Sequence, residues 1–116
     1  MADAATPELT LETVKTPGEI TFRCKGRLTS ATSSLLLTTV RGLMPETKMV
    51  VLDLTELTYM DSSGLGAVVG LYVSARRQKC GLKLINLSAR LQELFRITKL
   101  SAIFQGHEDF LGYTPD

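Results

Sequence analysis

The sequence contains no tryptophan, one histidine and two cysteines in 116 residues. A structural zinc site usually needs four Cys or His ligands. His107 and the distant Cys24 and Cys80 supply three at most, which argues against such a site. The cysteines form no CxxC pair, and the N-terminus shows no secretory signal, which favours free thiols in a reducing cytoplasm. The alternating pattern around Cys24 predicts a small buried side chain. We expect no metal and no cofactor.

The sequence also lacks a charge imbalance and a long apolar run. Thirteen Lys and Arg oppose twelve Asp and Glu, which leaves a net charge of +1 and argues against direct nucleic-acid binding. No uninterrupted apolar segment reaches the roughly 18 residues of a membrane-spanning helix. A chain of this length is typical of one small domain. We therefore expect a single cytoplasmic domain, monomeric or weakly dimeric, without a membrane span.

Strand patterns predict the sheet of an α/β domain. Residues 9–15 and 20–25 alternate with period two around a Thr-Pro-Gly-Glu turn, which predicts a hairpin. The apolar run 49–54 predicts a central strand, a connection follows at 55–60, and short strands are expected at 82–86 and 102–105. We expect a sheet of four to five strands.

Three helices are predicted between these strands. Their N-cap candidates are Thr29 and Ser30 for the first, Asp61 or Ser62 for the second, and Ser88 for the third. The apolar faces are, in chain order: Leu36, Val40 and Leu43; Leu65, Val68, Val69, Tyr72 and Val73; Leu91, Leu94, Phe95 and Thr98. Gly81 is expected just after the second helix. The order is ββαβαβαβ(α), with one domain over 1–116, a core at 9–105 and a tail at 106–116.

The run Asp61-Ser62-Ser63-Gly64-Leu65-Gly66 is the most informative segment for function. It places a carboxylate and two hydroxyls at a helix N-terminus, where free backbone N–H groups and the helix dipole attract negative charge, including a phosphate on serine. A purely structural interpretation is also open. In it Asp61 or Ser62 only caps the helix, worth about 1 kcal/mol, and the glycines let the helix approach the sheet.

Residues 50–66, VVLDLTELTYMDSSGLG, closely resemble the signature of the STAS family, the anti-sigma factor antagonists of bacterial stress and sporulation switches. The resemblance covers roughly residues 9–105. It implies a mixed sheet with helices packed against it, which agrees with the predicted order of strands and helices. It implies that Ser62, the serine directly after the aspartate, is phosphorylated by an anti-sigma kinase. Ser63 is the alternative site.

The resemblance further implies a partner-switching function. The unphosphorylated protein would bind an anti-sigma factor of the serine-kinase type and release a sigma factor. Phosphorylation of Ser62 would end this binding, and a phosphatase would restore it. The residues expected to contact the partner are Asp61, Ser62, Ser63, Gly64, Leu65, Arg27 and Thr29.

Two charge features leave the partner open. Many relatives carry Gly-Glu-Leu-Asp where this chain reads Gly-Arg-Leu-Thr at 26–29, so Arg27 either pairs with a phosphate, faces a different partner surface, or is merely solvated. The segment 76–99 carries seven basic residues against one acid. These charges either mark helix ends and solvated faces or steer an acidic partner towards the domain.

Other functions are less well supported by the sequence. An enzyme would need a base for Ser62, but the sole histidine is His107, and no nucleophile-elbow motif is present. The glycines at 64, 66 and 70 miss the dinucleotide-binding spacing. A non-switch STAS interaction subunit, in a stress-signalling scaffold or a lipid-transport complex, shares the fold and stays open as the alternative.

Overall fold

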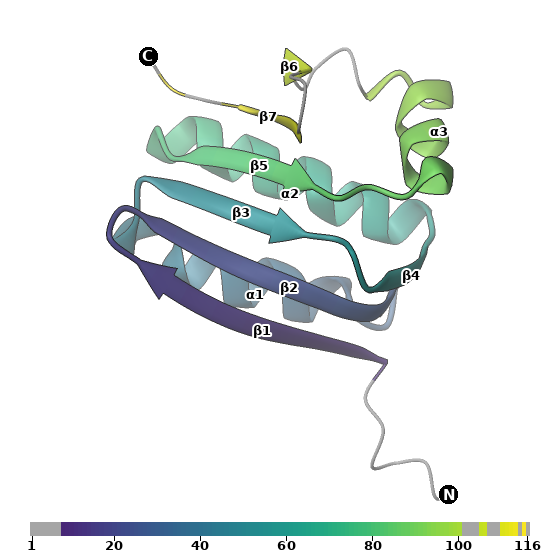
Figure 1. Ribbon diagram of the computed structural model, residues 1–116, viewed down its shortest axis with the longest axis horizontal. Coiled ribbons are helices and arrows are strands. Elements are labelled where there is room, and N and C mark those ends of the chain that lie inside the picture. The colour runs from purple at the N-terminus through teal and green to yellow at the C-terminus, as the bar shows by residue number, and fades with distance from the viewer. Residues whose placement is uncertain (1–7, 101–104, 107–109, 114, 116) are drawn as a thin grey trace, which may run out of the picture.

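The computed structural model describes residues 8–100, 105–106, 110–113 and 115, and in it a mixed sheet carries α1 and α2 on one face (Figure 1). The strands are β1 (Leu9–Thr16), β2 (Glu19–Leu28), β3 (Met49–Asp53), β4 (Leu57–Met60), β5 (Gly81–Ile85), β6 (Gln105–Gly106) and β7 (Phe110–Tyr113). The helices are α1 (Ser33–Leu43), α2 (Ser62–Gln78) and α3 (Ala89–Ile97), with a 3₁₀ turn at Met44–Glu46.

The strand order is β1-β2-β3-β5-β7-β6, and β4 pairs with β2 outside this path. Strands β2, β3 and β5 are parallel, whereas β1 and β7 are antiparallel to their neighbours. The predicted α/β fold, its mixed sheet and the central place of β3 are confirmed. Within the described residues, no helix is long and apolar enough to cross a membrane.

Among the described residues the sheet has seven strands rather than the expected four to five. Strand β4 forms within the expected connection 55–60, where it pairs in parallel with β2. Strand β7 forms within residues that the sequence places in the tail, and it pairs with β5. Most of the strand expected at 102–105 lies outside the described residues. Its last residue, Gln105, is described and begins β6.

The hairpin of β1 and β2 is confirmed, with Gly18 in its turn at φ +79°. However, β2 does not end at Lys25. The pairing register shifts at Gly26, whose φ is +114°, and the strand continues beyond it. Glycine is required at this position because a Cβ would lie 2.1 Å from the Glu8 carbonyl oxygen. The first half of β2 therefore pairs with β3 and its second half pairs with β4.

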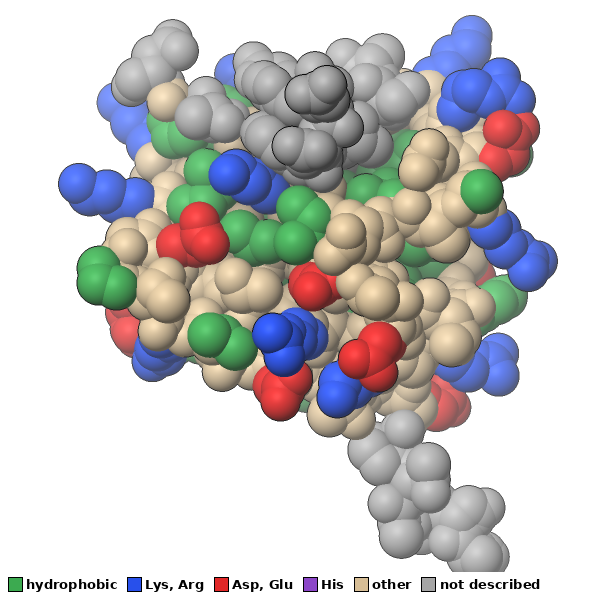
Figure 2. Space-filling model, viewed as in Figure 1, with side chains coloured by type: hydrophobic (Ala, Val, Ile, Leu, Met, Phe, Trp, Pro, Cys, Tyr) green, Lys and Arg blue, Asp and Glu red, His purple; other side chains and the backbone are tan. Residues whose placement is uncertain are grey.

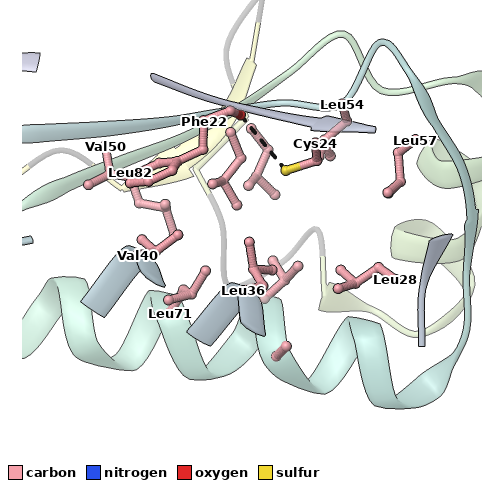
Figure 3. Packing of buried hydrophobic residues seen from close by; sticks show 14 of the residues in the cluster. Phe22, Cys24, Leu28, Leu36, Val40, Val50, Leu54, Leu57, Leu71 and Leu82 are labelled. Atoms are coloured by element: carbon pink, nitrogen blue, oxygen red, sulfur yellow. Dashed lines mark hydrogen bonds between the residues drawn. The ribbon is translucent and has the colours of Figure 1, made fainter. Parts of the chain in front are cut away.

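The core lies between the sheet and the helix pair (Figure 3). Phe22, Val50 and Leu82 point from the strands towards Val40 of α1 and Leu71 of α2, and all five are fully buried. Burying each large apolar side chain contributes about 1.5–3 kcal/mol, so this layer fixes the two helices against the sheet.

The buried face of α2 differs from the predicted one. The helix packs through Leu65, Val68, Leu71 and Ala75, whereas Val73 is 47% exposed. The predicted stripe omitted Leu71, which is fully buried. It also counted no small residues, whereas the alanines at 67 and 75 face the core. The helix is thus rotated relative to the prediction.

Two helix boundaries also differ from the predictions. Helix α1 follows Thr32, not Thr29 or Ser30, because the turn before it uses the Thr29 carbonyl oxygen to accept from the Ser33 N–H at 2.9 Å. Helix α2 ends at Gln78 and is followed by Lys79, a C-cap in the left-handed conformation, so Gly81 instead begins β5. The Ser88 cap of α3 is confirmed, since its hydroxyl accepts from the Leu91 N–H at 3.2 Å.

Both cysteines are free thiols in the interior. Cys24 is 3% exposed and Cys80 is 2% exposed, and the Cys24 thiol points to the Phe22 carbonyl oxygen at 3.8 Å (Figure 3). Burial, reinforced by the Asp53 carboxylate, raises the pKa of Cys24 to about 12. Burial likewise raises the pKa of Cys80. The predicted buried position of Cys24 is confirmed.

This burial predicts that the native protein resists thiol reagents. Because burial raises the pKa of Cys24, this thiol is protonated at pH 8 and the reactive thiolate is scarce. The side chain is also shielded from solvent. Titration with Ellman's reagent is expected to show no fast-reacting thiol in the folded protein and two in 6 M guanidinium. Fast reaction of a thiol under native conditions would contradict the packing.

Candidate functional site

The candidate site is the turn between β4 and α2. Asp61 occupies the single position between these elements, with extended backbone angles, and its carboxylate accepts from the Gly64 N–H at 3.0 Å. This bond satisfies one of the free N–H groups in the first helical turn. Asp61 is therefore the N-cap of α2, one of the two capping candidates predicted from the sequence.

Ser62 and Ser63 are the first two residues of α2, and both are exposed. The Ser33 hydroxyl lies 3.1 Å from the Ser63 carbonyl oxygen and 2.6 Å from that of Thr29. The N-terminal ends of α1 and α2 consequently lie side by side. Their combined dipoles give this end of the molecule a positive potential that favours negative groups.

The end of β2 packs directly against the first turn of α2. The Asp61 N–H donates to the Leu28 carbonyl oxygen at 3.2 Å, and a Cβ on Gly64 would lie only 2.4 Å from that same oxygen. Only glycine fits at this position without displacement. Gly64 and the neighbouring Leu65 are buried, so these two predicted contact residues position the turn and do not face solvent.

The last residues of β2 and the residues directly after it lie beside this turn. Arg27 pairs with Tyr59 across β2 and β4, and its exposed guanidinium lies 4.9 Å from the centre of the Tyr59 ring. Thr29 is half-buried, and its hydroxyl accepts from the Ala31 N–H at 3.2 Å. The structure thus brings Arg27, Thr29 and the two serines to one end of the domain.

A groove next to the turn was not predicted. Strand β4 pairs with β2 and not with β5. A space of about 340 Å³ therefore opens between β4 and α3. The residues lining it are Leu57, Thr58, Tyr59, Met60, Ser88, Arg90, Leu91, Glu93, Leu94 and Ile97. Ile97 is 60% exposed and Tyr59 is 40% exposed. The sequence offers one signal for this groove, the apolar side chains of Tyr59 and Ile97. That signal can be used only once β4 is known to be a strand.

A second polar cluster lies at the ends of β3 and β5. One Asp53 carboxylate oxygen accepts from the Thr55 N–H at 3.0 Å, the Thr55 hydroxyl at 2.6 Å and the Asn86 amide at 3.1 Å. Partial burial acts to raise the pKa of Asp53, but these bonds and nearby Arg23 outweigh it and hold the pKa below its ordinary value. The cluster ties two parallel strands together.

Asp53 also borders a small pocket on the sheet face that α1 and α2 leave uncovered. The pocket, of about 160 Å³, is lined by Arg23, Cys24, Asp53, Thr55 and Glu56. Figure 2 shows acidic and basic side chains interspersed on this face over β1 and β2, and Arg23 pairs with Glu12 at 3.4 Å. In the described parts of the chain, no three His, Cys, Asp or Glu side chains are grouped to hold a metal ion.

Comparison with known proteins gives a match over most of the chain. The family model for the STAS domain matches residues 10–110. The anti-sigma-B factor antagonist of Listeria monocytogenes is 52% identical over 54 residues, which are 47% of this chain and 47% of that protein. The match therefore spans about half the length of that relative.

Solved structures share the fold over a longer range. An anti-sigma factor antagonist from Mycobacterium paratuberculosis superposes with a TM-score of 0.74 at 16% identity, covering 86% of each chain. The antagonist SpoIIAA in its unphosphorylated form gives 0.64 at 21% identity, covering 82% of this chain and 94% of that one. Its phosphorylated form gives 0.64 at 21%, covering 81% and 86%. At these identities the likeness shows the fold alone.

The contact between Gly64 and Leu28 predicts opposite effects for two glycines of α2. Gly64→Ala forces a Cβ against the β2 backbone and is expected to lower the free energy of unfolding by about 1–3 kcal/mol. Gly66→Ala meets open space and is expected to raise it by about 0.5–1 kcal/mol, because alanine favours helix. Urea unfolding of both variants measures the difference, and effects of equal sign would contradict the geometry.

The Asp53 cluster predicts a pH-dependent contribution to stability. Because the folded-state pKa lies below that of the unfolded chain, this contribution is present at neutral pH and is lost as the pH falls through the folded-state pKa. Asp53→Asn is expected to cost roughly 1 kcal/mol at pH 7, and the difference from wild type should shrink towards pH 3. Urea unfolding at both values tests this, with Glu8→Gln as the control, since Glu8 is exposed and takes part in none of the ion pairs among the described residues. A pH-independent difference would contradict the assignment.

Proposed function

The chain belongs to the STAS domain family, and on that premise we propose that it acts as an anti-sigma factor antagonist. In its unphosphorylated form it binds an anti-sigma factor and so releases a sigma factor. The name of the Listeria relative supports this function. The observation that carries it is the exposed Ser62 in the first turn of a helix that Asp61 caps. The domain works in the cytoplasm through its partner, without catalysis, a cofactor or direct contact with nucleic acid.

The proposed contact surface is the end of the domain around Ser62. Ser62, Ser63 and Arg27 are exposed there, and Thr29 is half-buried beside them. Asp61 caps the helix, and Gly64 and Leu65 hold the turn against β2. These seven residues thus divide into those that would touch the partner and those that position them.

Phosphorylation of Ser62 is proposed as the switch. A phosphate adds about 1.5–2 negative charges at pH 7, which the helix N-terminus stabilises and the adjacent Asp61 carboxylate repels. In the free domain these effects partly cancel. In an interface the phosphate loses its hydration, and a loss of about 4 kcal/mol weakens binding roughly a thousandfold. The kinase is the anti-sigma factor itself, and a phosphatase resets Ser62.

Ser62 is proposed over Ser63 on the likeness to the family signature, and Ser63 is the alternative. That SpoIIAA has been solved in a phosphorylated form is consistent with a switch of this kind in a protein of the same fold. The domain acts as a monomer or weak dimer, since one exposed helix end suffices for the contact.

The proposal predicts opposite behaviour for two Ser62 variants. Ser62→Asp brings a negative charge into the interface and is expected to weaken binding to the serine-kinase anti-sigma factor of the same organism at least tenfold. Ser62→Ala should bind within about twofold of wild type but accept no phosphate there. Isothermal titration calorimetry measures both affinities, and a phosphopeptide map after incubation with ATP identifies the modified serine.

Matched Ser63 variants serve as the control for position. Phosphate on Ser63 and loss of binding by Ser63→Asp alone would transfer the switch to that residue. Equal binding by the aspartate and alanine variants at both serines would overturn the switch. In that case the chain would be a non-switch STAS interaction subunit, and affinity purification with the Ser62→Ala form would identify its assembly.

A further inference from the structure

The fold divides the basic segment 76–99 between two ends of the domain. Arg76, Arg77 and Lys79 lie at the C-terminal end of α2, whereas Arg90 and Arg96 lie on α3. Helix α2 is 17 residues long, which is about 25 Å, and strand β5 separates the two groups along the chain. Only the α3 group lies near the turn that holds Ser62, because α3 and β4 line the same groove.

At that end, two arginines lack a carboxylate partner among the described residues. Arg96 pairs with Glu93, and the Asp61 carboxylate, which accepts from the Gly64 N–H, keeps its single negative charge. Arg27 and Arg90, by contrast, take part in none of the ion pairs found in the described ranges, and both are exposed. Together with the helix N-termini they leave this surface positively charged.

Tyr59 holds Arg27 in a geometry suited to binding a carboxylate. The guanidinium lies 4.9 Å from the ring centre, a cation–π contact that restrains the side chain and uses none of its N–H donors. A guanidinium with free N–H groups forms bidentate hydrogen bonds to carboxylates. Because the arginine is held in place before binding, less conformational entropy is lost when the contact forms.

The groove lies between the two arginines. Tyr59, which carries Arg27, lines it from β4, and Arg90 lines it from α3. Leu57, Met60 and Leu91 in its lining are buried apolar residues. A segment that fits this surface has an apolar side chain for the groove and carboxylates on either side of it.

We propose that the anti-sigma factor presents an acidic segment to this domain, with Arg27 and Arg90 contacting its carboxylates on the two sides of the β4–α3 groove. This inference rests on the proposed function and adds the chemistry of the partner. It also explains the direction of the switch. A phosphate on Ser62 adds negative charge at the same end of the domain as Arg27, where it repels an acidic segment.

The test reverses the charge at each arginine. Arg27→Glu and Arg90→Glu are compared with Arg77→Glu, a matched control at the other end of α2. Arg77 is exposed and takes part in none of the ion pairs among the described residues. The probe is the serine-kinase anti-sigma factor of the same organism, measured by surface plasmon resonance at 50 and 300 mM salt. Arg27→Glu and Arg90→Glu are expected to weaken binding at least tenfold at low salt, mainly through the association rate, and to reduce its salt dependence. Arg77→Glu should stay within about twofold.

Two further variants separate the effect of the Arg27 charge on binding from that of its planar donor geometry and from the effect of an added acid. Arg27→Lys keeps the charge but loses the planar donor geometry, so it should bind between wild type and Arg27→Glu. Arg27→Ala removes the side chain without adding an acid, and it should also bind more weakly than wild type. Thermal unfolding of every variant checks that the fold is kept.

The outcomes distinguish this inference from the proposed function. If wild type binds and Ser62→Asp does not, but Arg27→Glu binds as well as wild type or better, the acidic segment is ruled out while the antagonist function stands. If wild type does not bind the anti-sigma factor, the proposed function fails and this inference fails with it. An equal loss with Arg77→Glu would mean a general charge effect and would also overturn the inference.

Discussion

The contact between the end of β2 and the first turn of α2 is the constraint on which the candidate site depends. The Leu28 carbonyl oxygen accepts from the Asp61 N–H at 3.2 Å, and the missing side chain of Gly64 lets the helix approach that oxygen. This contact exists only because β2 passes through Gly26 and continues to Leu28. It places the two serines beside α1 and sets Arg27 opposite Tyr59. It also draws β4 away from β5, which opens the groove against α3.

The parts of the fold that were predictable are those set by local pattern. The hairpin, the Asp61 and Ser88 caps and the apolar run of β3 each depend on a few adjacent residues, so the sequence alone specifies them. Strand β4 was not predictable in this way. Its four residues are buried, exposed, exposed and buried, which is not a period of two, and only the pairing with β2 makes them a strand.

The rest of the site required tertiary information. The core face of α2 includes small residues such as Ala75, which a pattern of large apolar side chains overlooks. The groove follows from β4, so it could not be seen without that strand. The division of the basic segment 76–99 also depends on the tertiary structure. Basic residues that are close in the chain are separated in space because β5 runs between α2 and α3. At the far end Arg76 lies over the rings of Tyr72 and Tyr113 at 5.8 and 5.3 Å, where it links α2 to β7.

The burial of both cysteines has a practical consequence for following the domain in solution. Since neither native thiol is accessible, a cysteine introduced on the surface would be the single site that a maleimide fluorophore labels quickly. Val73 is half exposed on α2, about three helical turns from Ser62. A dye there would report complex formation through changes in rotational diffusion, without removal of the native cysteines and without altering the end of the helix that carries the serines.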